Sequence, residues 1–247
     1  MIRRKEIFPS LFTMLNLFFG FFAIISAVQG KYVAASWMII IAGICDIIDG
    51  KLARKTKTYS EFGIEFDSLS DVVSFGAAPS VLIYQVFFYK IGASGLILSF
   101  MPLLFAAIRL ARFNINLESY EKESFDGLPT PAMAVTLATY VIFNYDLWEG
   151  LRFAPLLAPL VVFLSVLMVS HVEYEAMPKL TLHENKKNTV HLVFMLTGLT
   201  LMILFREKAM FPLIFGFVLY GVFKSWLFPS REEEEEDDEI LDIYIPD

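Results

Sequence analysis

The sequence predicts an all-α integral membrane protein with about eight transmembrane helices. Of its 247 residues, 56% are hydrophobic, and the mean hydropathy is +0.59, whereas soluble domains are roughly 45–50% apolar. The apolar residues also form runs long enough to cross a hydrocarbon layer of about 30 Å. Lys and Arg gather in alternate connecting segments, which is the pattern of the positive-inside rule.

The apolar runs predict where the helices lie. They cover residues 8–29, 33–57, 62–89, 92–115, 131–147, 152–171, 190–205 and 209–228. The first run has no small-residue cleavage site, so we interpret it as a retained helix and not as a signal peptide. With the N-terminus in the cytoplasm, 15 of the 20 Lys and Arg residues fall on the cytoplasmic side. Both termini are therefore expected in the cytoplasm.

The chain is expected to form one membrane-embedded domain, residues 1–230, followed by an acidic cytoplasmic tail, residues 231–247. After Arg231 the tail contains ten acids and no base, a like-charge run that predicts disorder. Without these acids the net charge changes from −7 to +3. The single cysteine, Cys45, excludes an intramolecular disulfide and a cysteine metal cluster. The sequence contains no footprint of nucleic-acid binding.

Four aspartates stand beside apolar sequence in the second and third predicted helices. Asp46 and Asp49 are three residues apart, and Asp67 and Asp71 are four apart, so each pair shares one helix face. A charge inside hydrocarbon costs about 2.5–3.5 kcal/mol even on lenient scales, so such carboxylates indicate a function. Four carboxylates at close range require cations, and oxygen ligands suit Mg²⁺, Mn²⁺ or Ca²⁺. We therefore predict a metal site near the cytoplasmic ends of these helices.

Small and basic residues accompany the aspartates. Gly50 and Ala53 share the face of the first pair, and Gly63 shares the face of the second. Their small side chains leave room for a ligand. Arg54 adds positive charge at the same level, as a phosphate-containing substrate requires.

Two other predicted helices carry polar groups of interest. Arg109 and Arg112 lie one turn apart near the end of the fourth helix. They either clamp a phosphate or carboxylate or extend to the lipid headgroups. Asn16 and Gly20 are four residues apart in the first helix. They either pack and hydrogen-bond against another helix or form a wall of a substrate pocket.

The aspartate stretch resembles the motif of the CDP-alcohol phosphatidyltransferase family. The pattern is Asp-x-x-Asp-Gly-x-x-Ala-Arg, then eight residues, then Gly-x-x-x-Asp-x-x-x-Asp. Its fixed positions here are Asp46, Asp49, Gly50, Ala53, Arg54, Gly63, Asp67 and Asp71. Three further stretches, and Thr-x-x-Asn-x-x-x-Gly in the first helix, are similar to the branch that uses L-serine. These stretches are residues 66–79, 109–114 and 127–132.

The resemblance implies transfer of the phosphatidyl group from CDP-diacylglycerol to the hydroxyl of L-serine, giving phosphatidylserine and CMP. It implies two Mg²⁺ or Mn²⁺ ions, with Ca²⁺ as another occupant, and a homodimer among membrane lipids. The implied metal ligands are Asp46, Asp49, Asp67 and Asp71, and Asp71 is also the implied general base. The residues implied to bind CDP-diacylglycerol are Asn16, Gly50, Ala53, Arg54 and Gly63. Arg109 and Arg112 are implied to bind the acceptor or a phosphate.

Two alternatives remain open. The same aspartates would serve a different acceptor, namely glycerol 3-phosphate, inositol phosphate or choline. The four carboxylates are also compatible with the ion path of a cation transporter. Metal-dependent nucleotide binding separates the second alternative from a transferase, because a transporter has no use for cytidine.

Overall fold

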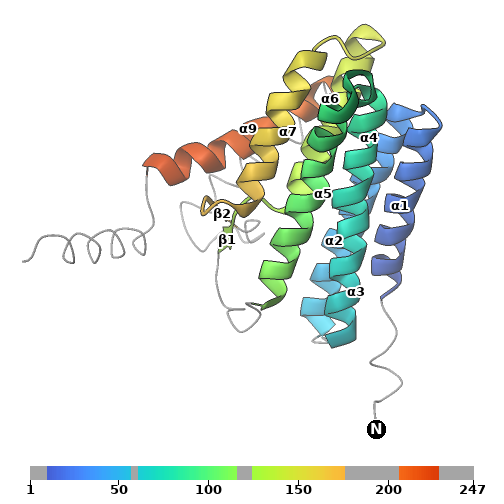
Figure 1. Cartoon of the computed structure of the whole chain (residues 1–247). Helices are drawn as coiled ribbons and strands as arrows, with labels where there is room; N and C mark the ends of the chain where they lie inside the picture. Colours follow the sequence, from blue (N-terminus) through green and yellow to red (C-terminus); the bar gives the residue numbers. More distant parts are fainter. Residues whose placement is uncertain (1–9, 57–60, 116–123, 176–205, 228–247) are drawn as a thin grey trace, which may run out of the picture.

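The computed structural model describes residues 10–56, 61–115, 124–175 and 206–227, which fold into a bundle of helices (Figure 1). Among these described residues, five helical segments are long and apolar enough to cross a membrane: Leu11–Val28, Tyr32–Ala53, Phe62–Val86, Phe88–Ile115 and Glu207–Leu227. The prediction of an all-α integral membrane protein is confirmed. The total of eight spans stays a prediction, and the span expected at residues 190–205 lies outside the described residues.

The first two helices form an antiparallel pair. Helix α1 (Leu11–Val28) begins after Ser10, whose hydroxyl accepts a hydrogen bond from the backbone N–H of Thr13 over 3.1 Å. This is the usual N-cap arrangement. A turn containing Gly30, which has a φ of +76°, leads into α2 (Tyr32–Thr56). Glycine adopts this left-handed conformation without a steric penalty.

The third span is interrupted by a π-helical segment. It consists of α3 (Glu61–Asp71), the π-helix η2 (Val72–Ala77) and α4 (Ala78–Val86). The backbone N–H of Ala78 bonds to the carbonyl of Val73, five residues earlier. Pro79 follows, and its ring would crowd the carbonyl of Phe75 in a regular α-helix. The wider turn immediately before Pro79 relieves that clash.

The remaining elements follow the predicted order, with two short strands added. They are the 3₁₀ turn η3 (Phe88–Ile91), α5 (Gly92–Ile115), β1 (Ser124–Asp126), α6 (Thr130–Trp148), α7 (Ala154–Val169), β2 (Glu173–Glu175) and α9 (Glu207–Leu227). The two strands pair in antiparallel register, with Phe125 opposite Tyr174. Helix α9 crosses the bundle obliquely, and the start of α1, the end of α2, the start of α3 and the end of α5 lie at one end (Figure 1).

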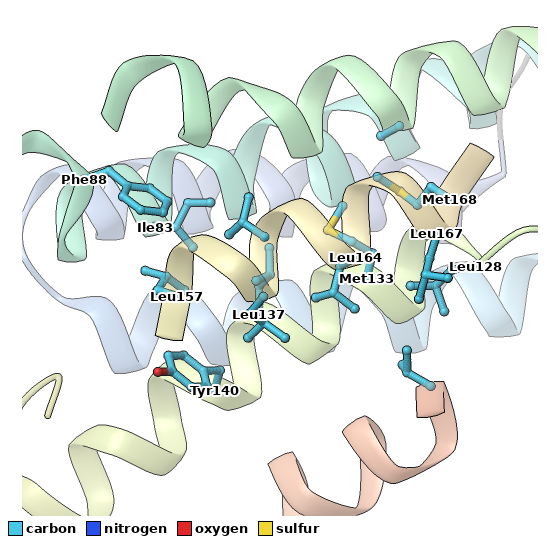
Figure 2. Close-up of a cluster of buried hydrophobic side chains, with 14 of the residues drawn as sticks. Ile83, Phe88, Leu128, Met133, Leu137, Tyr140, Leu157, Leu164, Leu167 and Met168 are labelled. Carbon is cyan, nitrogen blue, oxygen red and sulfur yellow. The ribbon is translucent and has the colours of Figure 1, made fainter. Parts of the chain in front are cut away.

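Helix α6 forms the centre of the molecule. One side of it, including Met133 and Leu137, packs into an apolar cluster with α4, α5, α7 and α9 (Figure 2). Its other side, including Ala134 and Ala138, packs against α1, α2 and α4. Eleven of its 19 residues are buried. Protein packs against both sides of this helix, so its apolar residues are not confined to one stripe.

Candidate active site

Three of the four predicted aspartates meet between α2 and α3. Asp46 lies in the second half of α2, and Asp67 and Asp71 lie on α3. One carboxylate oxygen from each of the three residues lies within 4.8 Å of the other two. The four-residue spacing on α3 brings its two aspartates to the same face. The site is at the end of the bundle where α1 begins and α5 ends (Figure 1).

Asp49 lies beside this group and has partners of its own. Its two carboxylate oxygens accept hydrogen bonds from the hydroxyls of Ser10 and Thr13 at the start of α1. Its negative charge nevertheless acts on Asp46 and Asp67. Asp49 therefore belongs to the same polar region, although its oxygens do not lie among the three that converge.

Asp71 is the most deeply buried of the four aspartates. It is 8% exposed, whereas the other three are half-buried. The side-chain amide of Asn16, which is fully buried in α1, donates a hydrogen bond to Oδ1 of Asp71 over 3.0 Å. Arg109 on α5 lies near enough for its positive charge to act on Asp71. Asp71 is thus held between α1 and α5.

The donor atoms fit a divalent cation. Within the part of the chain that the structure describes, Oδ1 of Asp67 is buried and has no hydrogen-bond partner. A buried polar oxygen without a partner is unfavourable, and a bound cation removes that cost. Carboxylate oxygens are the ligands that Mg²⁺ and Mn²⁺ prefer. Asp46, Asp67 and Asp71 could hold such an ion together.

The other residues proposed for substrate binding have varied surroundings. Ala53 and Gly63 are half-buried, and Gly50 is exposed near the end of α2. The side chain of Arg54 lies outside the described part of the structure. Arg109 and Arg112 differ, because Arg109 is half-buried beside Asp71, whereas Arg112 is exposed at the end of α5.

One link between helices was not predicted, and a second fits the interhelical packing interpretation of Asn16 and Gly20. Asn114 on α5 and Ser68 on α3 hydrogen-bond through their side chains, with the Asn114 amide nitrogen 3.1 Å from the Ser68 hydroxyl. The Ser74 hydroxyl, in the π-helical segment, donates to the backbone carbonyl of Asn16 over 2.9 Å. A Cβ added to Gly20 would overlap Ser74, so the spacing of Asn16 and Gly20 was the available sequence signal.

Comparison with known proteins decides the family. The profile of the CDP-alcohol phosphatidyltransferase family matches residues 6–169, about two thirds of the chain. The chain belongs to the CDP-alcohol phosphatidyltransferase family. Its membership agrees with the eight motif positions of the aspartate stretch, all of which lie inside the matched region.

Several relatives of this phosphatidyltransferase are similar over most of its length. A CDP-diacylglycerol–serine O-phosphatidyltransferase of Helicobacter pylori is 38% identical over 224 residues, which is 90% of this chain and 92% of the relative. A protein of the same name from Methanocaldococcus jannaschii is 32% identical over 86% of this chain and 90% of its own. An archaetidylserine synthase of Methanothermobacter thermautotrophicus is 35% identical over 67% of this chain and 68% of its own.

Proposed function

We propose that this protein transfers the phosphatidyl group of CDP-diacylglycerol to the hydroxyl of L-serine, forming phosphatidylserine and releasing CMP. The observation that carries the reaction class is the group of carboxylates from Asp46, Asp67 and Asp71 inside a membrane-embedded helical bundle. The choice of serine is supported by the names of relatives that are similar along nearly the whole chain.

Asp71 is the residue that takes the proton in this proposal. The serine hydroxyl oxygen forms a bond to the lipid-linked phosphorus, and the bond from that phosphorus to the CMP oxygen breaks. The hydroxyl proton passes to the carboxylate of Asp71. The Asn16 amide donates to Oδ1 of Asp71, and we assign the proton transfer to the other carboxylate oxygen, Oδ2.

The carboxylates also provide the metal ligands. We assign Mg²⁺ or Mn²⁺ as the native metal, with two ions bound and Ca²⁺ as another occupant. When bound, the metal neutralises negative charge on the pyrophosphate and on the departing CMP. The proposed ligands are Asp46, Asp49, Asp67 and Asp71.

The remaining proposed residues hold the two substrates. Arg109 and Arg112 provide positive charge for the serine carboxylate or for a phosphate. Arg109 has the better supported role, because it already lies beside Asp71. The residues proposed to surround CDP-diacylglycerol are Asn16, Gly50, Ala53, Arg54 and Gly63.

The surroundings of the site suit a substrate that stays anchored in the bilayer. Apolar side chains close to the aspartates in sequence are exposed on the outside of α2 and α3, including Leu52, Phe62 and Leu69. Lipid chains that contact such residues would remain in the membrane while the nucleotide reaches the carboxylates. From the Lys and Arg distribution, we propose that the site and both termini face the cytoplasm. We further propose that residues 1–230 form the catalytic domain, as a homodimer, and residues 231–247 a separate tail.

The test is release of CMP from CDP-diacylglycerol by the purified full-length protein with Mn²⁺ or Mg²⁺. L-Serine, glycerol 3-phosphate, inositol phosphate and choline are compared as acceptors, each with and without EDTA. We expect release with serine alone, and no release with EDTA. Release with a different acceptor would keep the chemistry and overturn the choice of serine. Family membership weighs against cation transport, and absence of release with every acceptor from folded protein would reopen that alternative.

A further inference from the structure

One side of α1 is lined by small and polar residues. We call Ser10, Thr13, Asn16 and Gly20 the polar face of α1; they are spaced by three or four residues and therefore share one side of the helix. Thr13, Asn16 and Gly20 are buried, and Ser10 is half-buried. Exposed apolar side chains cover the opposite side: Leu11, Met14, Phe18 and Phe21.

The beginning of the polar face contacts the end of α2. The hydroxyls of Ser10 and Thr13 each donate to a different carboxylate oxygen of Asp49. The two hydroxyl oxygens also lie 2.9 Å apart, and the Ser10 hydroxyl accepts from the backbone N–H of Thr13. Both donors are therefore held in place by α1 itself.

The next turns of the polar face contact the other aspartate helix. The side-chain amide of Asn16 donates to Asp71 at the end of α3, and the backbone carbonyl of Asn16 accepts from the Ser74 hydroxyl. Gly20 allows the backbone of α1 to approach Ser74 closely. A single helix thus contacts both of the helices that carry the four aspartates.

We propose that Ser10 and Thr13 are positioning residues, which hold the Asp49 carboxylate beside the other three and thereby tune the affinity for the metal. This inference rests on the proposed function, in which Asp49 is a metal ligand. Each oxygen of an ionised carboxylate has two lone-pair sites, so the bond from α1 leaves one site on each oxygen for a cation. Removing an outer-shell partner of this kind typically costs about 10–100-fold in metal affinity.

Thr13 is the better position for a test. Ser10 is the N-cap of α1, so its removal also affects the start of the helix. Thr13→Val keeps the shape and β-branching of the side chain and removes only the hydroxyl. Thr136→Val in α6 is the matched control, because Thr136 is also buried and, among the described residues, its hydroxyl donates to the Ala132 carbonyl of the same helix.

The measurement is the Mn²⁺ dissociation constant of the full-length protein, from the electron paramagnetic resonance signal of free Mn²⁺. We expect Thr13→Val to raise this constant about 10–100-fold and Thr13→Ser to recover most of the affinity. Thr136→Val is expected to bind Mn²⁺ as the wild type does. Because the loss is one of affinity, a high Mn²⁺ concentration should restore much of the CMP release by Thr13→Val.

Two further variants separate the possible failures. Ser10→Gly removes the other hydroxyl donor but keeps an acceptable N-cap, and it replaces Thr13→Val as the test if that variant does not fold. Asp46→Asn tests the metal site itself. Wild-type affinity in Thr13→Val or Ser10→Gly, together with weakened binding in Asp46→Asn, would overturn the positioning role alone. Unchanged Mn²⁺ binding in Asp46→Asn would overturn the metal site of the proposed function, and the inference with it.

Discussion

Replacing Asn16 with alanine removes the amide that donates to Oδ1 of Asp71 over 3.0 Å. Asn16 is fully buried and Asp71 is 8% exposed, so water is poorly placed to substitute for the lost donor. A hydrogen bond to a charged group contributes about 1.5–3 kcal/mol. Since each 1.36 kcal/mol of barrier is tenfold in rate, we expect kcat to fall about 10–150-fold if the bond orients Asp71 for proton transfer.

The assay is the initial rate of CMP release at saturating CDP-diacylglycerol, L-serine and Mn²⁺. Asn144→Ala is the matched control, because Asn144 is also a fully buried asparagine but lies on α6. Its amide donates to the Tyr140 carbonyl over 2.9 Å, and its carbonyl accepts from the backbone N–H of Phe153 over 3.2 Å. The control is expected to lower the melting temperature while keeping kcat per folded molecule.

Two results would count against this reasoning about Asn16. An unchanged kcat in Asn16→Ala would refute the orienting role of its amide. An unchanged kcat together with a raised KM for CDP-diacylglycerol would place Asn16 in the wall of the lipid pocket, as the family resemblance implies. A fall in kcat with an unchanged KM is the result that the bond to Asp71 predicts.

Three further changes have defined outcomes. Asp71→Asn should abolish CMP release and retain CDP-diacylglycerol binding, because an amide cannot accept the hydroxyl proton; an active variant would contradict this. Gly20→Ala should lower the melting temperature, since its Cβ collides with the π-helical segment and overpacking costs about 1–3 kcal/mol. Gly216→Ala is its control, because a Cβ at Gly216 meets nothing within 4 Å in the described part of the structure. Equal melting temperatures of the two variants would refute the collision. Tyr174→Phe should lower the free energy of unfolding by about 0.5–1.5 kcal/mol, because it removes the hydrogen bond from the Tyr174 hydroxyl to the Val218 carbonyl of α9. Burial raises the pKa of Tyr174 from 10.0 to about 12. As pH rises, this hydroxyl therefore ionises at a lower pH in the unfolded chain than in the folded protein. The wild type should therefore lose stability relative to Tyr174→Phe as pH rises through that interval, and parallel pH curves would contradict this.

The helices were predictable wherever an apolar run determines them. The run at residues 92–115 corresponds to α5 (Gly92–Ile115), and the run at residues 131–147 corresponds to α6 (Thr130–Trp148). Inside a bilayer the backbone N–H and C=O groups can form hydrogen bonds only with each other, so a long apolar run is strongly favoured to form a helix. These two apolar runs therefore locate the helices to within a few residues.

The π-helical segment (Val72–Ala77) could not be predicted in the same way. The sequence indicated one continuous helix over residues 62–89, whereas the structure widens it directly after Asp71. Pro79 was a visible local signal. The contact of Ser74 with Asn16 and Gly20 was not, because it depends on how α1 packs against this span.

The positions of the aspartates were also only partly predictable from the sequence. The four-residue spacing of Asp67 and Asp71 correctly placed them on one side of α3. The three-residue spacing of Asp46 and Asp49 likewise predicted that both carboxylates would join the metal site, whereas the converging group includes Asp46 and not Asp49. They differ because the start of α1 lies against Asp49 and supplies the hydroxyls of Ser10 and Thr13. That difference arises from packing between helices, which spacing within one helix does not contain.

Anomalous scattering at the manganese absorption edge tests the proposed site most directly, using crystals of the full-length protein grown with Mn²⁺. We predict a manganese peak coordinated by carboxylate oxygens of Asp46, Asp67 and Asp71, and no peak there in Asp46→Asn. A peak at other residues, or none at a Mn²⁺ concentration that supports CMP release, would contradict the claim that these carboxylates form the catalytic metal site.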